Sequence, residues 1–325
     1  MNPPGVARYP DDMTTSNRIV RLLFAAGGAF LLAGCGSEET PESASANGDP
    51  PAATTPEATP QTAATNERPA PDQTLRAAGF DVSVWDAGDA GEGRLEIARS
   101  GEVVGAYTGE RFELGGPGPS DQRVGLGEDI TGDGNANLIV ELWTGGLACC
   151  VDYLIFELEG DRPELLGRLS AQTGGRFEDF NGDGIMEVRV RDGAFLGWNA
   201  TVEESPAPPV VLAWDGLWYT PAPALMEAPP PTPEQLANWQ QMVESGEEWN
   251  APGEFAPPPQ LWGVALDLMY TGHPDLGVAF LHSAWNDAAP GRDAFIARLM
   301  DRLETSQYWP EIGRAYGRAG DADVN

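Results

Sequence analysis

Two segments rich in Asp, Asn and Gly carry the side chains best suited to binding a metal ion. They begin at Asp129 and Asp179, and in each one oxygen-bearing side chains occupy positions 1, 3, 5 and 9 while Gly occupies position 6. Calcium takes roughly six to eight oxygen ligands, and this spacing turns alternate side chains inward around a bend that Gly permits. The spacing therefore predicts two calcium-binding loops, which the flanking elements must hold in place.

The residues after each loop predict a strand and not the helix of an EF-hand. Position 12 is Val140 in the first loop and Val190 in the second, where an EF-hand has a bidentate Glu. Apolar residues then alternate from Leu138 to Leu142 and from Val188 to Arg191, which is a strand pattern. With these features the loops resemble the calcium-binding turns of FG-GAP or VCBS repeats, the modules of integrin-type propellers.

The resemblance implies which atoms would bind calcium. The implied ligands are the side chains of Asp129, Thr131, Asp133 and Asn137 with the carbonyl of Asn135, and the side chains of Asp179, Asn181, Asp183 and Glu187 with the carbonyl of Ile185. The second loop offers three carboxylates and the first offers two, so the second site is expected to bind calcium more tightly. Asp, Asn and Gly also form ordinary turns, and plain connectors without metal are the alternative.

The composition excludes other kinds of partner. Of 325 residues, 50 are acidic and 19 are basic, which gives a net charge of −31. Binding to nucleic acid requires clustered cations, so nucleic acid is excluded as a partner. Because no run approaches the ~18 apolar residues of a spanning helix, we expect contact with a membrane only through an N-terminal anchor.

The N-terminal residues predict export and lipidation. Two Arg residues precede an apolar stretch over 22–32, which ends in Leu32-Ala33-Gly34-Cys35. A charged region, a short apolar region and small residues before a cleavage point are typical of a signal peptide. The final tetrapeptide resembles the lipobox of bacterial lipoproteins, which implies removal of residues 1–34 and acylation of Cys35; an ordinary signal peptide is the alternative. Since Gly36 is not Asp, the outer membrane of the cell envelope is favoured, with the protein periplasmic or surface-exposed.

Shifts in composition divide the rest of the chain. Residues 35–73 are rich in Ser, Thr, Pro and Ala without periodicity, which predicts a disordered tether. Strand patterns predict a β domain over 74–222, and a Pro-rich linker over 223–231 leads to a helical domain over 232–313 and a flexible tail over 314–325. The expected fold class is α+β.

The strands of the β domain are expected to be antiparallel. Residues Phe80 to Val84 alternate, the run Tyr153 to Leu158 is almost continuously apolar and predicts a central strand, and Asp215-Gly216 predicts a tight hairpin. The region is too short for the four blades of ~42 residues that close the smallest propellers. We therefore expect a partial propeller-like or a sandwich-like arrangement.

A capping box predicts where the helices begin. Thr232 is followed by Gln235, so a helix should start directly after Thr232. Three further amphipathic stretches predict helices over 261–269, 276–285 and 295–303. Four helices of this length favour a small antiparallel bundle or paired hairpins.

Cys149 and Cys150 are the only thiols left once Cys35 is lipidated, and an exported domain meets an oxidising compartment. Adjacent Cα atoms are ~3.8 Å apart, below the ~4.4 Å of ordinary disulfides, so a vicinal disulfide would be strained. A vicinal disulfide and a pair of buried thiols both agree with the sequence.

Catalytic residues are not indicated by any motif. His273 and His282 are expected to cap or pack helices because no nucleophile motif accompanies them. Asp192 with Glu203 and Glu204 could supply a glycosidase pair, but exposed acidic residues abound in this chain. Three Trp residues late in the β domain are expected to fill its core: Trp198, Trp214 and Trp218.

Together these observations predict a lipid-anchored envelope protein that acts as a non-enzymatic binding or structural module, with an unknown protein or glycan as its ligand. The stretch from Gly145 to Pro208 also resembles a group of uncharacterised repeat-containing bacterial envelope proteins, which implies a location but no activity. The alternative is a hydrolase of envelope glycans or peptidoglycan, which would show a concave site with perturbed acids.

Overall fold

The computed structural model describes residues 69–86, 92–145, 150–244 and 257–322. All of them belong to one compact unit, residues 66–325, in which antiparallel sheets precede the helices. This arrangement confirms the expected α+β class. None of the helices in these ranges is long and apolar enough to cross a membrane. The predicted signal peptide and nearly all of the predicted tether lie outside the described residues.

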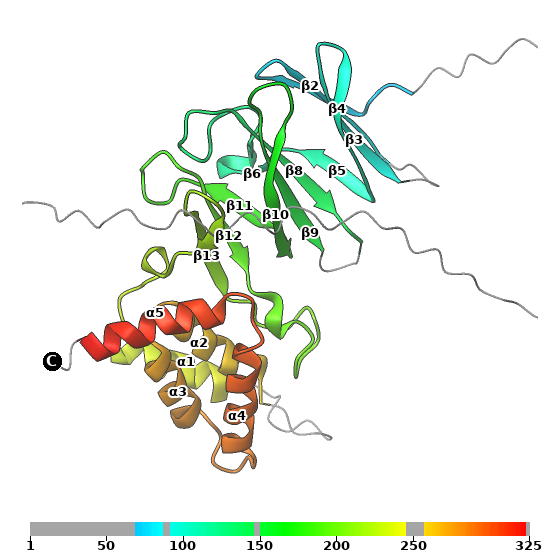
Figure 1. Ribbon diagram of the computed structural model, residues 1–325. Helices are drawn as coiled ribbons and strands as arrows, with labels where there is room; N and C mark the ends of the chain where they lie inside the picture. Colours follow the sequence, from blue (N-terminus) through cyan, green and yellow to red (C-terminus); the bar gives the residue numbers. More distant parts are fainter. Residues whose placement is uncertain (1–68, 87–91, 146–149, 245–256, 323–325) are drawn as a thin grey trace, which may run out of the picture. The chain divides into compact units, whose positions relative to one another are not determined.

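Three four-stranded antiparallel sheets make up the β region (Figure 1). The first has the order β1-β2-β3-β4: β1 (Gln73–Ala77), β2 (Phe80–Trp85), β3 (Gly93–Arg99) and β4 (Glu102–Gly109). The second has the order β10-β9-β8-β5: β5 (Arg111–Leu114), β8 (Asn137–Trp143), β9 (Val151–Glu157) and β10 (Glu164–Gln172). The third has the order β11-β12-β13-β14: β11 (Gly175–Glu178), β12 (Glu187–Arg191), β13 (Pro209–Trp214) and β14 (Tyr219–Pro221). A short pair, β6 (Gly116–Pro117) and β7 (Arg123–Val124), lies between β5 and β8 in the chain.

The second sheet is buried on both faces. Leu154 and Phe156 of β9 belong to a core shared with the first sheet, whereas Tyr153 and Ile155 belong to a core shared with the third sheet. A strand covered on both sides reads as a continuous apolar run. The central position predicted for this strand is therefore confirmed, since β9 pairs with both β8 and β10.

The predicted hairpin at Asp215-Gly216 connects β13 to β14. The Asp215 carboxylate accepts hydrogen bonds from the backbone N–H groups of Leu217 at 2.9 Å and Trp218 at 2.8 Å. Gly216 adopts a φ of 94°, which a residue with a Cβ would avoid. Local turn chemistry thus fixes the register of the two strands.

The described helices number five: α1 (Pro233–Glu244), α2 (Pro259–Tyr270), α3 (Pro274–Ser283), α4 (Arg292–Leu303) and α5 (Trp309–Ala322). The capping box is formed as predicted, with Thr232 N–H bonded to the Gln235 side chain at 2.8 Å and Gln235 N–H bonded to the Thr232 hydroxyl at 3.2 Å. The flexible tail predicted from residue 314 is wrong for 314–322, which belong to α5. Gly313 and Gly317 lower the helix propensity there, and buried packing of Ile312 and Tyr316 overrides it.

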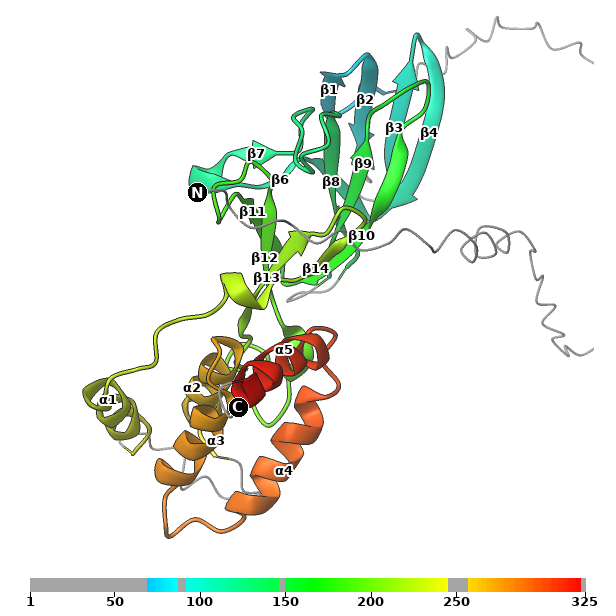
Figure 2. The ribbon, with the colours of Figure 1, turned by 60° about the vertical axis from the view of Figure 1, so that its left-hand side comes forward.

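The helices share a core with the third sheet. Trp262 of α2 and Leu299 of α4 are fully buried in the same apolar cluster as Val210 of β13 and Val188 of β12. Figure 2 shows the helices gathered beyond β12 and β13, on the side away from β1–β4. The helices and the third sheet therefore share one continuous core. The sequence instead predicts two domains joined by a linker at 223–231.

Candidate metal centre

The two Asp/Gly loops occupy equivalent places in neighbouring sheets. The first loop, residues 129–137, leads into β8, and the second loop, residues 179–187, leads into β12. In both loops the glycines at positions 4 and 6 have a positive φ, between 78° and 92°. Gly adopts this conformation without steric cost, which explains why the two loops can follow the same path.

Four hydrogen bonds are common to both loops. The Asp at position 1 accepts from the N–H of position 4 (2.7 and 2.6 Å) and of position 6 (2.8 and 3.0 Å). The Asp at position 5 accepts from the N–H of position 7 (2.9 and 2.8 Å). The side chain at position 9 accepts from the N–H of position 2 (2.8 and 2.7 Å). The sequence similarity between the loops is therefore a structural similarity.

The loops also pack against each other. The N–H of Met186 in the second loop donates to the carbonyl of Ile130 in the first at 3.0 Å. A Cβ added to Gly132 would lie 2.7 Å from Cγ1 of Ile185, so this glycine allows the close approach. A substitution in one loop should therefore also affect the conformation of the other loop.

The side chains at position 9 differ in what they can offer a cation. Asn137 is fully buried, and its Oδ1 already accepts from Ile130 N–H at 2.8 Å and from the Thr131 hydroxyl at 3.4 Å. Its Nδ2 is buried without a hydrogen-bond partner among the described residues. Glu187 is also buried, and burial raises its pKa. Its Oε2 caps Phe180 N–H and its Oε1 accepts from the Asn181 amide, so a cation that binds Oε1 would have to displace only that amide.

A carboxylate outside the predicted ligand set lies beside the first loop. Glu157, the last residue of β9, is close enough to the side chains of Asp133 and Asn135 for both to shift its pKa. The Asn135 backbone N–H and the Glu157 side chain lower the pKa of Asp133, while interaction with the Asp133 side chain and burial raise the pKa of Glu157. Glu157 is the register partner of Asn137, and that pairing of β9 with β8 is the signal that would have identified it.

In the second loop an amide lies among the carboxylates. The Nδ2 group of Asn181 donates to Asp183 and to Glu187, each at 2.9 Å. The carbonyl oxygens at position 7, of Asn135 and Ile185, accept no hydrogen bond from the described residues outside strands and helices. Both oxygens thus remain available to a cation, as the resemblance to calcium-binding turns implies.

The donor set fits calcium better than a transition metal. Among the described residues there is no group of three or more His, Cys, Asp and Glu side chains arranged to hold a metal ion. Each loop instead combines carboxylates with amide, hydroxyl and carbonyl oxygens, the ligands that calcium accepts. Asp133 also raises the pKa of the neighbouring Glu157, and a divalent cation bound between two such carboxyl groups would favour their charged forms.

We expect Glu157→Gln to weaken calcium binding at the first loop by about tenfold, because the variant removes a carboxylate that lies beside Asp133. Isothermal titration of the purified protein should show this change. The matched control is Glu159→Gln, which removes a charge from an exposed residue of the same segment. Equal affinity of both variants and the wild type would show that Glu157 does not contribute to the site.

Of the three cysteines, only Cys150 lies in the part of the chain that the structure describes. Cys150 is disulfide-bonded and has a φ of 96°. Cys149, its predicted partner, and Cys35 lie outside the described residues. The backbone of Cys150 is held by its neighbours, since its N–H donates to the Gln172 carbonyl at 2.6 Å and its carbonyl accepts from the Thr144 hydroxyl at 2.9 Å.

The carboxylates that could supply a glycosidase pair differ in exposure to solvent. Asp192 is 1% exposed, and its Oδ2 accepts hydrogen bonds from the hydroxyls of Tyr270 and Ser306 while its Oδ1 accepts from Ala194 N–H at 2.9 Å. Glu203 and Glu204 are exposed. Asp192 is therefore committed to joining η3 (Gly193–Phe195) to the helices.

One histidine contacts the backbone, the other is exposed, and the late tryptophans pack against the core. The Nε2 atom of His273, directly before α3, lies 2.8 Å from the Ala228 carbonyl, and His282 is in the last turn of α3. The three late tryptophans pack against the core, as predicted: Trp198, Trp214 and Trp218. Gly167 makes room for the ring of Trp218, since a Cβ there would overlap it.

Comparison of the chain with protein-family models, with curated proteins and with solved structures found no match in any of the three. The likeness to FG-GAP and VCBS turns thus rests on the two loops themselves.

Proposed function

We propose that this protein is anchored in the cell envelope by a lipid on Cys35 and that its β region, stabilised by calcium, acts as a non-enzymatic binding or structural module. The observation that carries the proposal is the pair of loops, which share four hydrogen bonds, offer oxygen ligands and pack against each other. A protein or glycan of the envelope would be the ligand, and the lipid would be the contact with the membrane. The outer membrane is the favoured location.

We also propose that the three sheets are consecutive blades of an open, partial propeller. Each is antiparallel and four-stranded, and the second sheet packs against the first through one face and against the third through the other. Blades of a propeller follow one another in this way. The two loops support the proposal because each leads into the second strand of its sheet, β8 or β12.

The test of the module against a hydrolase uses the purified protein. We expect no release of sugars or peptides from peptidoglycan or envelope glycans. Hydrolysis that is lost when one carboxylate outside the two loops is changed would overturn the proposal in favour of an enzyme. Retention of the protein by one of these polymers without hydrolysis would support it.

For the anchor, we expect Cys35→Ser to abolish acylation and to leave the chain uncleaved at Gly34 or released from membranes. Mass spectrometry of the wild-type protein should show an acylated Cys35 as the first residue. Ser37→Ala provides the matched control, because it changes a residue close to Cys35 without touching the lipobox. An unmodified Cys35, with cleavage elsewhere, would refute the lipid anchor.

A further inference from the structure

Three arginines line one hollow of this acidic protein. Arg176 of β11 and Arg189 and Arg191 of β12 surround a cavity of about 470 Å³, which Glu141 of β8 and Tyr153 of β9 also line. The chain has 19 basic residues and a net charge of −31. The concentration of three of them at one cavity therefore requires an explanation.

The strand pairing places the three positive charges on one face. Arg176 and Arg189 are directly opposite each other in the β11–β12 register, and Arg191 lies two residues further along the same strand, so its side chain is on the same side. Like charges directly opposite each other destabilise an antiparallel pair. A bound anion would convert this repulsion into attraction.

Few groups among the described residues form hydrogen bonds or ion pairs with these three arginines. Arg176 forms an ion pair with Glu178 at 3.2 Å, and Arg191 donates to the Ala207 carbonyl at 3.1 Å. The guanidinium carbon of Arg189 lies 4.3 Å from the centre of the Phe180 ring, a stacking contact that leaves the edge of the guanidinium open. Each guanidinium has five N–H donors, and most of these donors form no hydrogen bond with the residues that the structure describes.

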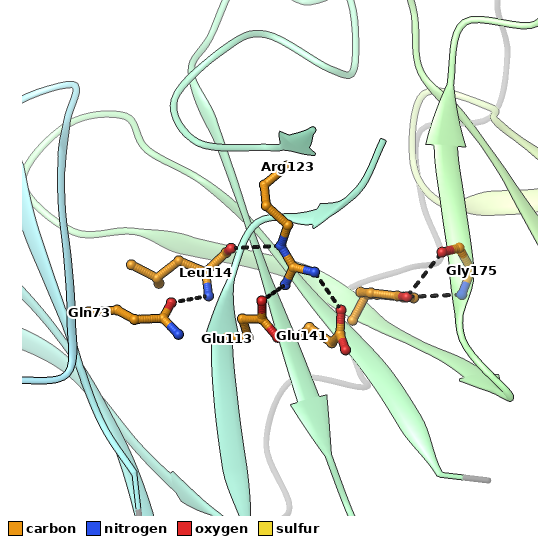
Figure 3. A network of polar contacts seen from close by, with 7 residues as sticks. Gln73, Glu113, Leu114, Arg123, Glu141 and Gly175 are labelled. Carbon is orange, nitrogen blue, oxygen red and sulfur yellow. Dashed lines mark hydrogen bonds and ion pairs between the residues drawn. The ribbon is translucent and has the colours of Figure 1, made fainter. Parts of the chain in front are cut away.

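Glu141, the carboxylate that lines the cavity, forms an ion pair with an arginine of β7. Arg123 Nη1 pairs with Glu141 at 3.2 Å, and Arg123 also contacts Glu113 and the Leu114 carbonyl, as Figure 3 shows. The hydroxyl of Tyr153 is likewise held by the backbone of Gly175, with the Gly175 N–H at 2.9 Å. Glu141 thus shares a fourth arginine with Glu113, and Arg176 is paired with Glu178, so Arg189 and Arg191 carry the positive charge of the cavity.

We propose that this cavity, which we call the arginine pocket, binds a carboxylate or phosphate group carried by a ligand of about the size of a monosaccharide. Guanidinium groups bind planar or tetrahedral oxyanions through paired N–H donors. A volume of about 470 Å³ falls within the range of small-ligand sites, ~300–1,000 Å³, and exceeds what an isolated inorganic ion would fill. Because the proposal names a ligand class for the envelope module, it rests on the proposed function. The residues of the pocket are nevertheless separate, since they include neither Cys35 nor a predicted calcium ligand.

The test is a calorimetric titration of the purified protein at low salt with glucuronate, glucose 6-phosphate and glucose. At least one of the two anionic sugars should bind about tenfold more tightly than glucose, and about 0.5 M salt should reduce the difference. Binding of one anionic sugar only would identify its acidic group as the one recognised. Failure of both to bind more tightly than glucose would overturn the proposal.

Variants assign the binding to the arginine pocket. Arg189→Gln and Arg191→Gln should each weaken binding of the anionic sugar by about tenfold, since each removes charged hydrogen bonds to it. Arg162→Gln is the matched control, because Arg162 is exposed and does not line the cavity. Undiminished binding by both pocket variants would overturn the assignment. Repeating the titration with a chelator separates anion binding from calcium binding, so that either can fail alone.

Discussion

Calcium at about 100 times its dissociation constant should stabilise the folded protein by about 2.7 kcal/mol for each loop that it occupies. For a folded unit of this size, that corresponds to a rise in melting temperature of roughly 5–10 °C per loop. The stabilisation arises because only the folded chain brings the oxygens of positions 1, 3, 5, 7 and 9 together. Magnesium should be a poor substitute, since it demands a tighter octahedron and gives up water reluctantly.

The variants Asp133→Asn and Asp183→Asn test the two loops separately. Each should lower the calcium-induced rise in melting temperature, and the double variant should abolish it. Only the difference between calcium and chelator is compared, because removing a charge also changes the stability of the metal-free protein. Asp275→Asn, an exposed change in the first turn of α3, serves as the control. The same melting temperature in calcium, magnesium and chelator would show that the loops are ordinary turns.

The structure changes one expectation about the relative strength of the sites. When only the residues of the two loops are counted, the second site has more carboxylates than the first. Glu157, which lies beside Asp133, would add a third carboxylate to the first site if calcium drew it in, so we expect the two sites to differ less than their sequences predict. In the Glu157→Gln variant, the second loop should again bind calcium more tightly than the first, as the sequences of the loops predict.

Elements whose signals are local were predictable from the sequence. The hairpin at Asp215-Gly216, the capping box at Thr232 and the strands that follow the two loops all depend on residues within a few positions of one another. The central strand β9 was also predictable, because burial on both faces leaves a continuous apolar run from Tyr153 to Leu158. These elements position the loops and the arginine pocket.

Features that depend on pairing between distant segments were not predictable in this way. Glu157 joins the first loop only through the register of β9 with β8. Arg176 and Arg189 become neighbours only when β11 pairs with β12. The helix α5 carries three glycines that weaken its local signal, and its formation depends on packing against α2.

Asp192 is the residue whose loss should destabilise the protein most. Its carboxylate is the shared acceptor for Tyr270 of α2, for Ser306 before α5 and for the Ala194 backbone. The Ser306 hydroxyl in turn accepts from the N–H of Trp309 at 2.9 Å, so the carboxylate also holds the start of α5. One side chain therefore ties the end of β12 to two helices.

We expect Asp192→Ala to lower the free energy of unfolding by about 3 kcal/mol or more, because it leaves buried hydroxyls and an N–H without their charged acceptor. The melting temperature should fall by roughly 6–12 °C. Asp192→Asn should cost less, since the amide keeps the shape and one acceptor oxygen. Urea unfolding and thermal melts of both variants, with Asp161→Ala at a fully exposed turn as the control, would measure this. A loss in Asp192→Ala no larger than in Asp161→Ala would mean that the helices are held to the third sheet by apolar packing alone, without help from this carboxylate.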